Sequence, residues 1–198
     1  MNRLRLNSAS RLDGVSPTAR PMRLAEAAEL RARLATACGN CDGVTGAHCI
    51  HELWMRGEFA ANIEPALQQL WHGAAESIPD WLPMRHIDWL PTAYEVSERF
   101  AARRRGAANI YLVLLDYSDS RPEPYGVYVG MTRFSPSERF DQHKAGIRAA
   151  GSVLRRGIEL LTGPVLHLQG ISRPEATQIE ERLAAALGDA GLFVQGGH

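Results

Sequence analysis

The chain has 198 residues, with 22 basic and 22 acidic side chains, and 45% of it is apolar. This length allows one ordinary domain or two small ones, and the apolar content excludes a globally disordered chain. Three cysteines do not make a disulfide scaffold, and no run of about 18 apolar residues predicts a membrane helix. No apolar block follows the N-terminal arginines, so no secretory signal is indicated and we expect a cytoplasmic protein. Because the net charge is zero, any surface that binds a polyanion must be local.

The N-terminal half shows helical patterning behind a polar leader. Residues 1–22 have no hydrophobic period, which indicates a disordered leader. Helices are expected where good helix formers gather, over residues 23–37, 59–77 and 92–105. Glycines between the first two helices predict a loop that carries the cysteines: Gly39, Gly43 and Gly46. Residues 23–106 are therefore expected to form a mainly helical accessory region that recognises substrate or a protein partner.

Cysteine and histidine side chains gather in that glycine-rich stretch. Cys38 and Cys41 form a C-x₂-C pair, and His48 and Cys49 follow closely. Three thiolates and one imidazole are a donor set for tetrahedral zinc. The gap between the two pairs is shorter than the usual finger spacing, so buried free thiols beside a loop histidine are the alternative. The sequence thus predicts a candidate structural zinc knuckle and leaves that alternative open.

A basic cluster ends the third expected helix. Its members are Arg99, Arg103, Arg104 and Arg105. Guanidinium groups at one helix end can lie along a phosphate backbone. A helix end that faces only solvent is equally common, so both interpretations stay open.

Residues 107–198 predict an α/β (α+β) domain. In chain order, we expect strands over 109–116 and 125–131, a helix over 136–147, a short helix near 151–161, a strand over 164–169 and a helix over 173–188. Both long helices follow a Ser-x-x-Glu capping box, which begins at Ser135 and at Ser172. The expected fold is a small three-stranded sheet flanked by helices.

Candidate site residues come from these two helices. Arg139 and His143 are four residues apart, so they share one helix face and can both reach a phosphate. Glu180 lies in an apolar stripe with three other residues, Ala176, Leu183 and Leu187. A carboxylate in that stripe requires a cation, from an arginine or a metal ion, because an unpaired buried charge is costly. The purely structural alternatives are a solvated helix face and a glutamate–arginine pair at the edge of the core.

Two tyrosines, Tyr111 and Tyr128, lie in the middle of the two expected strands. Tyr128 alternates with Gly126 and Gly130, which leaves space beside its hydroxyl for a ligand. Packing in the core is the alternative role for both rings.

Taken in order, these residues resemble the GIY-YIG nuclease family. The matching segments are Asn109-Ile110-Tyr111, Tyr128-Val129-Gly130-Met131-Thr132, Ser135 through Gly146, and Ala176 with Glu180. The resemblance covers residues 109–194 and does not explain the N-terminal half. It implies a small three-stranded sheet flanked by helices, and an endonuclease that hydrolyses phosphodiester bonds in DNA or another nucleic acid.

The resemblance also implies a role for each site residue. Of the two motif tyrosines, Tyr111 is favoured as the base that deprotonates water, with Tyr128 and His143 assisting proton transfer. Arg139 would clamp the scissile phosphate, and Glu180 would hold one Mg²⁺ or Mn²⁺ ion. Further basic residues expected to contact nucleic acid are Arg133, Lys144 and Arg148, together with Arg103 and Arg104 of the basic cluster.

The chain departs from the family pattern at three points. Asn109 stands in place of the first motif glycine, a proline-rich loop lengthens the connection between the tyrosines, and only Gln195 can replace an asparagine that many members carry. These departures favour an alternative function, in which the domain binds nucleic acid or a protein partner and has lost useful catalysis.

Overall fold

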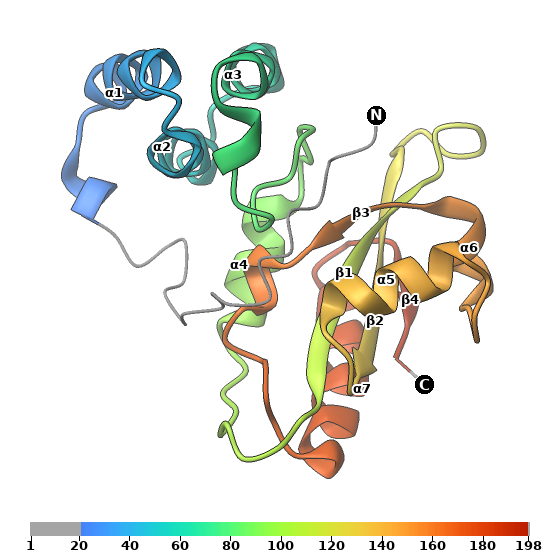
Figure 1. The fold of residues 1–198 in the computed structure, drawn as a ribbon. Coiled ribbons are helices and arrows are strands. Elements are labelled where there is room, and N and C mark those ends of the chain that lie inside the picture. The colour runs from blue at the N-terminus through green and yellow to red at the C-terminus, as the bar shows by residue number, and fades with distance from the viewer. Residues whose placement is uncertain (1–20, 198) are drawn as a thin grey trace. The chain divides into compact units, whose positions relative to one another are not determined.

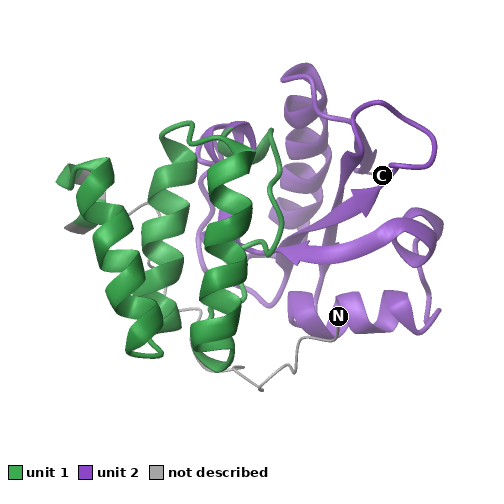
Figure 2. Cartoon of the chain, turned by 90° about the horizontal axis from the view of Figure 1, so that it is seen from above, with its two compact units in different colours: residues 1–91 green, residues 92–198 purple. Residues whose placement is uncertain are grey.

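The computed structural model describes residues 21–197, and the chain divides into two compact units, Met1–Pro91 and Thr92–His198 (Figures 1 and 2). Most of the leader expected over residues 1–22 lies outside the described residues, and its last two residues begin the 3₁₀ helix η1 (Pro21–Leu24). Across the described part of the chain, the helices are too short or too polar to cross a lipid bilayer.

Unit 1 contains three helices that pack on one another: α1 (Ala27–Gly39), α2 (Gly43–Met55) and α3 (Ala60–Ala74), followed by the 3₁₀ helix η2 (Ala75–Ser77). The glycine-rich loop expected between the first two helices is wrong, because α2 already begins at Gly43. Its N-cap is Asp42, whose side chain accepts a hydrogen bond from the Thr45 backbone N–H at 3.0 Å. Gly46 serves close packing, since a Cβ there would lie 2.3 Å from Leu70 Cδ1.

Helix α4 (Leu90–Ser97) ends eight residues before the expected end at residue 105. His167 explains the early end, because its Nε2 lies 3.1 Å from the Ser97 carbonyl oxygen and 3.0 Å from that of Phe100. The imidazole thereby satisfies carbonyl groups that a longer helix would use internally. The arginines expected at a helix end therefore follow the helix in an irregular segment.

Unit 2 is an α+β unit built on a mixed four-stranded sheet. Its strands are β1 (Asn109–Asp116), β2 (Tyr125–Thr132), β3 (Gly157–Leu161) and β4 (Val194–Gly196), in the order β3-β1-β2-β4. The expected hairpin of β1 and β2 is confirmed, with antiparallel pairing along all of both strands. The expectation of three strands is not confirmed, because the short strand β4 adds a parallel edge to β2.

The third strand lies elsewhere than the sequence predicts. Residues 157–161 form β3, directly after the short helix α6 (Gly151–Arg156), whereas the expected strand over 164–169 begins in the 3₁₀ helix η3 (Gly163–Val165). Pro164 has no backbone N–H to give to a sheet ladder, and proline is common at the start of a helical turn. This local preference of Pro164 keeps residues 164–169 out of the sheet, although most of them are apolar.

Helices cover both faces of the sheet: α5 (Pro136–Lys144) and α6 pack on one face, and α7 (Arg173–Asp189) packs on the other (Figures 1 and 2). The capping box of α5 is confirmed: Ser135 Oγ accepts from the Glu138 backbone N–H at 3.2 Å, and Glu138 Oε2 accepts from the Ser135 N–H at 3.0 Å. The second box is wrong, because Ser172 makes no side-chain cap. Glu175 Oε1 instead accepts from the backbone N–H of Arg103 at 3.4 Å.

Candidate active site

The two tyrosines face each other across the β1–β2 hairpin. The register pairs Tyr111 with Gly130 and Val113 with Tyr128, which places both rings on the sheet face covered by α5 and α6. The ring centroids lie 5.9 Å apart. A Cβ at position 130 would lie 2.6 Å from Tyr111 Oη and 2.7 Å from Tyr128 Cε1, so only glycine fits there. The space above Gly130 is therefore filled by the rings of Tyr111 and Tyr128.

His143 completes a cluster of three rings, with its centroid 6.0 Å from that of each tyrosine. Its Nδ1 accepts the Ala150 backbone N–H at 2.9 Å, and its Nε2 lies 2.9 Å from Tyr111 Oη. Because Nδ1 is an acceptor, the proton of the neutral imidazole lies on Nε2, which donates it to Tyr111 Oη. Both ring nitrogens thus have protein partners, and His143 orients Tyr111 rather than touching a phosphate.

Burial shifts the pKa of every member of this cluster. Burial raises the pKa of Tyr111 well above its usual value and lowers that of His143 to about 4, so the imidazole is neutral at pH 7. Burial also raises the pKa of Tyr128, while a hydrogen bond from Tyr111 and the charge of Arg139 lower it. Tyr111 is only 2% exposed, whereas Tyr128 is partly exposed. Tyr128 is therefore the phenol that solvent or a ligand reaches more easily.

Arg139 lies beside this cluster on α5, and its guanidinium is held by three acceptors. Nη1 donates to Gln142 Oε1 at 3.2 Å and to the Ile147 carbonyl at 3.3 Å, and Nη2 donates to the Arg148 carbonyl at 2.9 Å. Its positive charge lowers the pKa of both tyrosines and that of His143. Arg139 and His143 thus share one helix face, as the spacing predicts, and both interact with Tyr111.

Glu180 occupies the apolar stripe of α7, as the sequence predicts, and is 8% exposed. Burial raises the pKa of its carboxyl group, and a hydrogen bond from the Met131 backbone N–H lowers it in part. The backbone N–H groups of Val127 and Met131 point to the same edge of β2, where β4 pairs. The pairing with β4 ends at Val129, so the Met131 N–H is left for Glu180. The negative charge of Glu180 raises the pKa of Tyr128, so the two groups interact electrostatically.

The expected cation beside Glu180 is not an arginine of the described residues, because no ion pair there involves this carboxylate. A buried carboxylate with one backbone donor retains free lone pairs. A single oxygen ligand of this kind suits Mg²⁺ or Mn²⁺, which keep most of their water ligands. Glu180 therefore fits the metal-binding role, with water or substrate oxygens as the remaining ligands.

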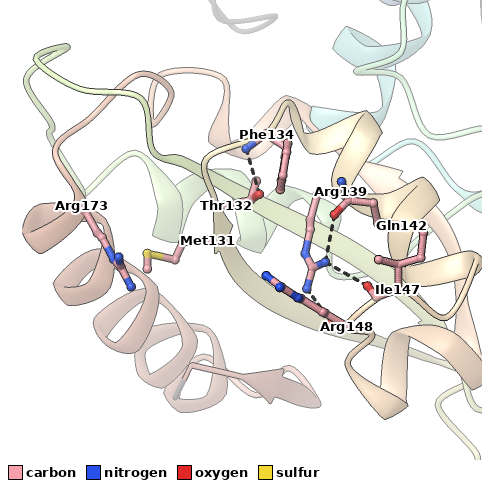
Figure 3. Close-up of a pocket in the computed structure, with 8 residues that line it drawn as sticks. All are labelled: Met131, Thr132, Phe134, Arg139, Gln142, Ile147, Arg148 and Arg173. Atoms are coloured by element: carbon pink, nitrogen blue, oxygen red, sulfur yellow. Dashed lines mark hydrogen bonds between the residues drawn. The ribbon is translucent and has the colours of Figure 1, made fainter.

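A hollow of about 610 Å³ opens beside Arg139 (Figure 3). Its lining comes from the end of β2 and the turn after it, from α5 and the segment after it, and from the start of α7: Met131, Thr132, Phe134, Arg139, Gln142, Ile147, Arg148 and Arg173. Arg173 and Phe134 are not among the site residues that the sequence predicts. Both lie next to the N-cap of a helix, and the capping pattern there gives no indication that they line a site.

Neither protein-family models, nor curated proteins, nor solved structures match this chain. Its function is therefore inferred from the arrangement of its own residues.

The other basic residues expected to contact nucleic acid lie in varied surroundings. Lys144 Nζ donates to the Gly157 carbonyl at 2.8 Å, which ties α5 to β3. Arg133 is exposed, with its guanidinium carbon 5.2 Å from the centre of the Phe134 ring. Arg103 and Arg104 are exposed in the segment after α4, and Arg148 lines the hollow.

Two departures from the family pattern have structural counterparts. Asn109, in place of a glycine, donates from Nδ2 to the Phe134 carbonyl at 2.8 Å and accepts from the Gly170 N–H on Oδ1 at 2.9 Å. It thus links the start of β1 to the segment that carries Phe134. Gln195 pairs with Tyr128 in the β2–β4 register and shares its sheet face.

The candidate zinc ligands do not form a shared site. In the part of the chain that the structure describes, no three His, Cys, Asp or Glu side chains are placed to hold one metal ion. Cys49 Sγ lies 3.7 Å from Met22 Sδ, and burial raises its pKa to about 11, which disfavours the thiolate that zinc needs. His48 packs against Trp81 with ring centroids 4.9 Å apart, and Cys41 is exposed. The structure gives no support to a zinc site at Cys38, Cys41, His48 and Cys49. The zinc site therefore remains a prediction from the sequence.

Proposed function

We propose that unit 2 is a metal-dependent endonuclease that hydrolyses phosphodiester bonds in nucleic acid, with DNA as the expected substrate. One observation carries the proposal: five polar side chains from two strands and two helices are linked through neighbouring interactions, namely Tyr111, Tyr128, Arg139, His143 and Glu180. The charge of Arg139 acts on both tyrosines and on His143, and the charge of Glu180 acts on Tyr128. Their chain order and spacing also support membership of the GIY-YIG family, with β3, β1 and β2 as its three-stranded sheet and β4 as an added edge.

Arg139 would bind the scissile phosphate. Its guanidinium is already oriented by Gln142 and two backbone carbonyls, and one side of it faces the hollow. A guanidinium binds phosphate oxygens through a bidentate fork and stabilises the charge that gathers on them in the transition state. This orientation before substrate arrives lowers the reorganisation needed for the reaction.

Tyr128 would remove the proton from the attacking water, rather than Tyr111 as the sequence favours. Tyr111 is buried and its oxygen accepts the proton of His143 Nε2, so its own hydroxyl proton is available to Tyr128. Donation by Tyr111 and the charge of Arg139 both stabilise a phenolate at Tyr128. Tyr111 and His143 then act as positioning residues that set the orientation and acidity of Tyr128.

Glu180 would hold the Mg²⁺ or Mn²⁺ ion, which would supply positive charge to the reacting phosphate oxygens. The buried position of Glu180 strengthens this interaction, since few waters compete for its oxygens. The carboxylate lies at the open edge of β2, within electrostatic reach of Tyr128.

A test compares wild-type protein with Glu180→Gln and Glu181→Gln on supercoiled plasmid with Mg²⁺ or Mn²⁺. Glu181 is the matched control, because it is adjacent, carries the same charge and is exposed. We expect wild-type and Glu181→Gln to nick the plasmid, and EDTA or Glu180→Gln to abolish nicking. Full activity in Glu180→Gln contradicts the metal assignment.

Glu180→Gln also tests how the buried carboxylate affects the free energy of unfolding. Burial raises the pKa of Glu180 in the folded state above its value in the unfolded chain. The protonated carboxyl group therefore stabilises the fold at low pH, and this stabilisation is lost as pH rises through the folded-state pKa. Glu180→Gln removes that loss, and its free energy of unfolding at pH 7 should equal or exceed that of wild-type. Loss of activity with retained stability separates a catalytic defect from unfolding.

The alternative function, a nucleic-acid-binding module without useful catalysis, is favoured by the raised pKa of both phenols. It predicts that wild-type protein retards DNA on a gel but leaves plasmid intact at every metal concentration and pH.

A further inference from the structure

The hollow beside Arg139 has a lining that the proposed chemistry does not use. Arg148 contributes from the segment after α5, and Arg173 from the first position of α7 (Figure 3). None of the eight lining residues is acidic, and three are arginines. Its volume of about 610 Å³ lies within the range of about 300–1,000 Å³ typical of small-molecule sites.

Arg148 and Arg173 are free to receive an anion. Among the described residues, no ion pair involves either guanidinium, and both side chains are exposed. Arg148 has a φ of +45°, a conformation that non-glycine residues rarely adopt. Its carbonyl accepts from Arg139 Nη2 at 2.9 Å, which fixes its backbone beside the proposed phosphate site. Strained residues held in this way are concentrated at functional sites.

Apolar groups lie beside these cations. Phe134 is 38% exposed and Ile147 is 56% exposed, and both line the hollow with Met131. An exposed aromatic ring next to arginines matches the two parts of a nucleotide, because the base stacks on the ring and the phosphate pairs with guanidinium. A base inside a duplex has neighbours on both faces and cannot stack on a protein ring.

We propose that this hollow binds an unpaired nucleotide next to the scissile phosphate, with its base on Phe134 and its phosphates on Arg148 and Arg173. This inference rests on the proposed function and defines its substrate class: strands with a single-stranded segment beside the cut. The chemistry of base and phosphate is common to DNA and RNA, so both are included in the test.

The test measures binding by fluorescence anisotropy with the full wild-type chain in EDTA, which prevents cleavage and separates binding from catalysis. The probes are a labelled single-stranded DNA, the RNA of the same sequence, a blunt DNA duplex and a poly-glutamate peptide. We expect single strands to bind at least tenfold more tightly than the duplex or the peptide. Equal affinity for single strand and duplex, or for the peptide, overturns the proposal. The DNA and RNA arms show which sugar the site accepts.

Two variants assign the residues. Phe134→Ala should weaken single-strand binding by about 5- to 150-fold, the range expected for loss of one stacked base, and should leave duplex binding unchanged. Arg148→Ala/Arg173→Ala should reduce the salt dependence of single-strand binding, by about 0.7 in the log–log slope for each phosphate that the protein no longer neutralises.

Arg155→Ala/Arg182→Ala is the matched control, since it removes the same charge from exposed positions of unit 2 outside the hollow. An equal change of slope in the control overturns the assignment to Arg148 and Arg173. Arg148→Lys/Arg173→Lys should restore most of the slope, because the positive charge is kept. A lysine pair that behaves like the alanine pair also overturns the assignment. If plasmid nicking fails while the single-strand preference holds, the hollow is a binding site and the proposed catalysis is wrong.

Discussion

Two neighbouring regions of unit 2 handle polar groups in opposite ways. In the cluster of Tyr111, Tyr128 and His143, the imidazole has a protein partner on both nitrogens and burial shifts each pKa. In the hollow lined by Arg148 and Arg173, guanidinium groups face solvent without an ion-pair partner among the described residues. The first region is held together by its own hydrogen bonds, whereas the second leaves the side chains of Arg148 and Arg173 exposed.

Arg139 belongs to both regions and therefore couples them. Its field lowers the pKa of the buried rings, and its guanidinium lines the open hollow. An anion bound at Arg139 would therefore also change the acidity of the rings behind it. Removing this side chain should damage both regions at once.

Among the changes that test this comparison, the largest expected effect comes from Arg139→Ala. Loss of a preorganised donor to a charged transition state lowers turnover by about 10²- to 10³-fold, and Arg139→Lys should recover only part of this because an ammonium group lacks the planar fork. Single-turnover cleavage of a short labelled substrate measures the effect, with Arg155→Ala as the control on an exposed site. An unchanged rate in Arg139→Ala would show that another cation holds the phosphate.

A smaller and asymmetric effect is expected from the two tyrosines. Tyr128→Phe should reduce the rate by about 10²-fold, the low end of the range for a lost general base, because burial raises the pKa of Tyr128 and leaves little phenolate near neutral pH. Tyr111→Phe should reduce it less and move the rising limb of the pH–rate profile to higher pH, because Tyr111 no longer lowers the pKa of Tyr128. The reverse ranking, with Tyr111→Phe the more damaging and no change in the profile, would return the base role to Tyr111.

The smallest expected effect concerns stability and the buried imidazole. An unfolded histidine titrates near pH 6.5, whereas folded His143 has a pKa of about 4, so between these values the unfolded chain binds the extra proton. The free energy of unfolding should therefore fall as pH drops from 6.5 to 4, by up to about 3 kcal/mol from this group. Urea unfolding at several pH values measures this slope.

His143→Gln should flatten that slope relative to wild-type, whatever its own stability. His72→Gln is the control, because His72 is exposed on α3 in unit 1. A slope that survives in His143→Gln would place the proton uptake on another group.

Local patterns predicted several elements well. The β1–β2 hairpin, the Ser135 capping box and the buried stripe of α7 depend on residues close together in sequence, and all three are confirmed. Some of the wrong predictions depend on residues far apart in the sequence. Helix α4 is capped by His167 from far along the chain, and Glu175, expected to cap α7, accepts from the backbone N–H of Arg103 instead.

The sequence by itself determined which chemical groups are present, their order, and the faces on which Glu180, Tyr111 and Tyr128 lie, because helix and strand periods are local properties. Only the tertiary structure decided which tyrosine is buried, that His143 is held by Ala150, and that Arg173 joins Arg148 at one hollow. These outcomes depend on groups brought together from separate elements, and desolvation and charge at such meeting points cannot be inferred from spacing along the chain.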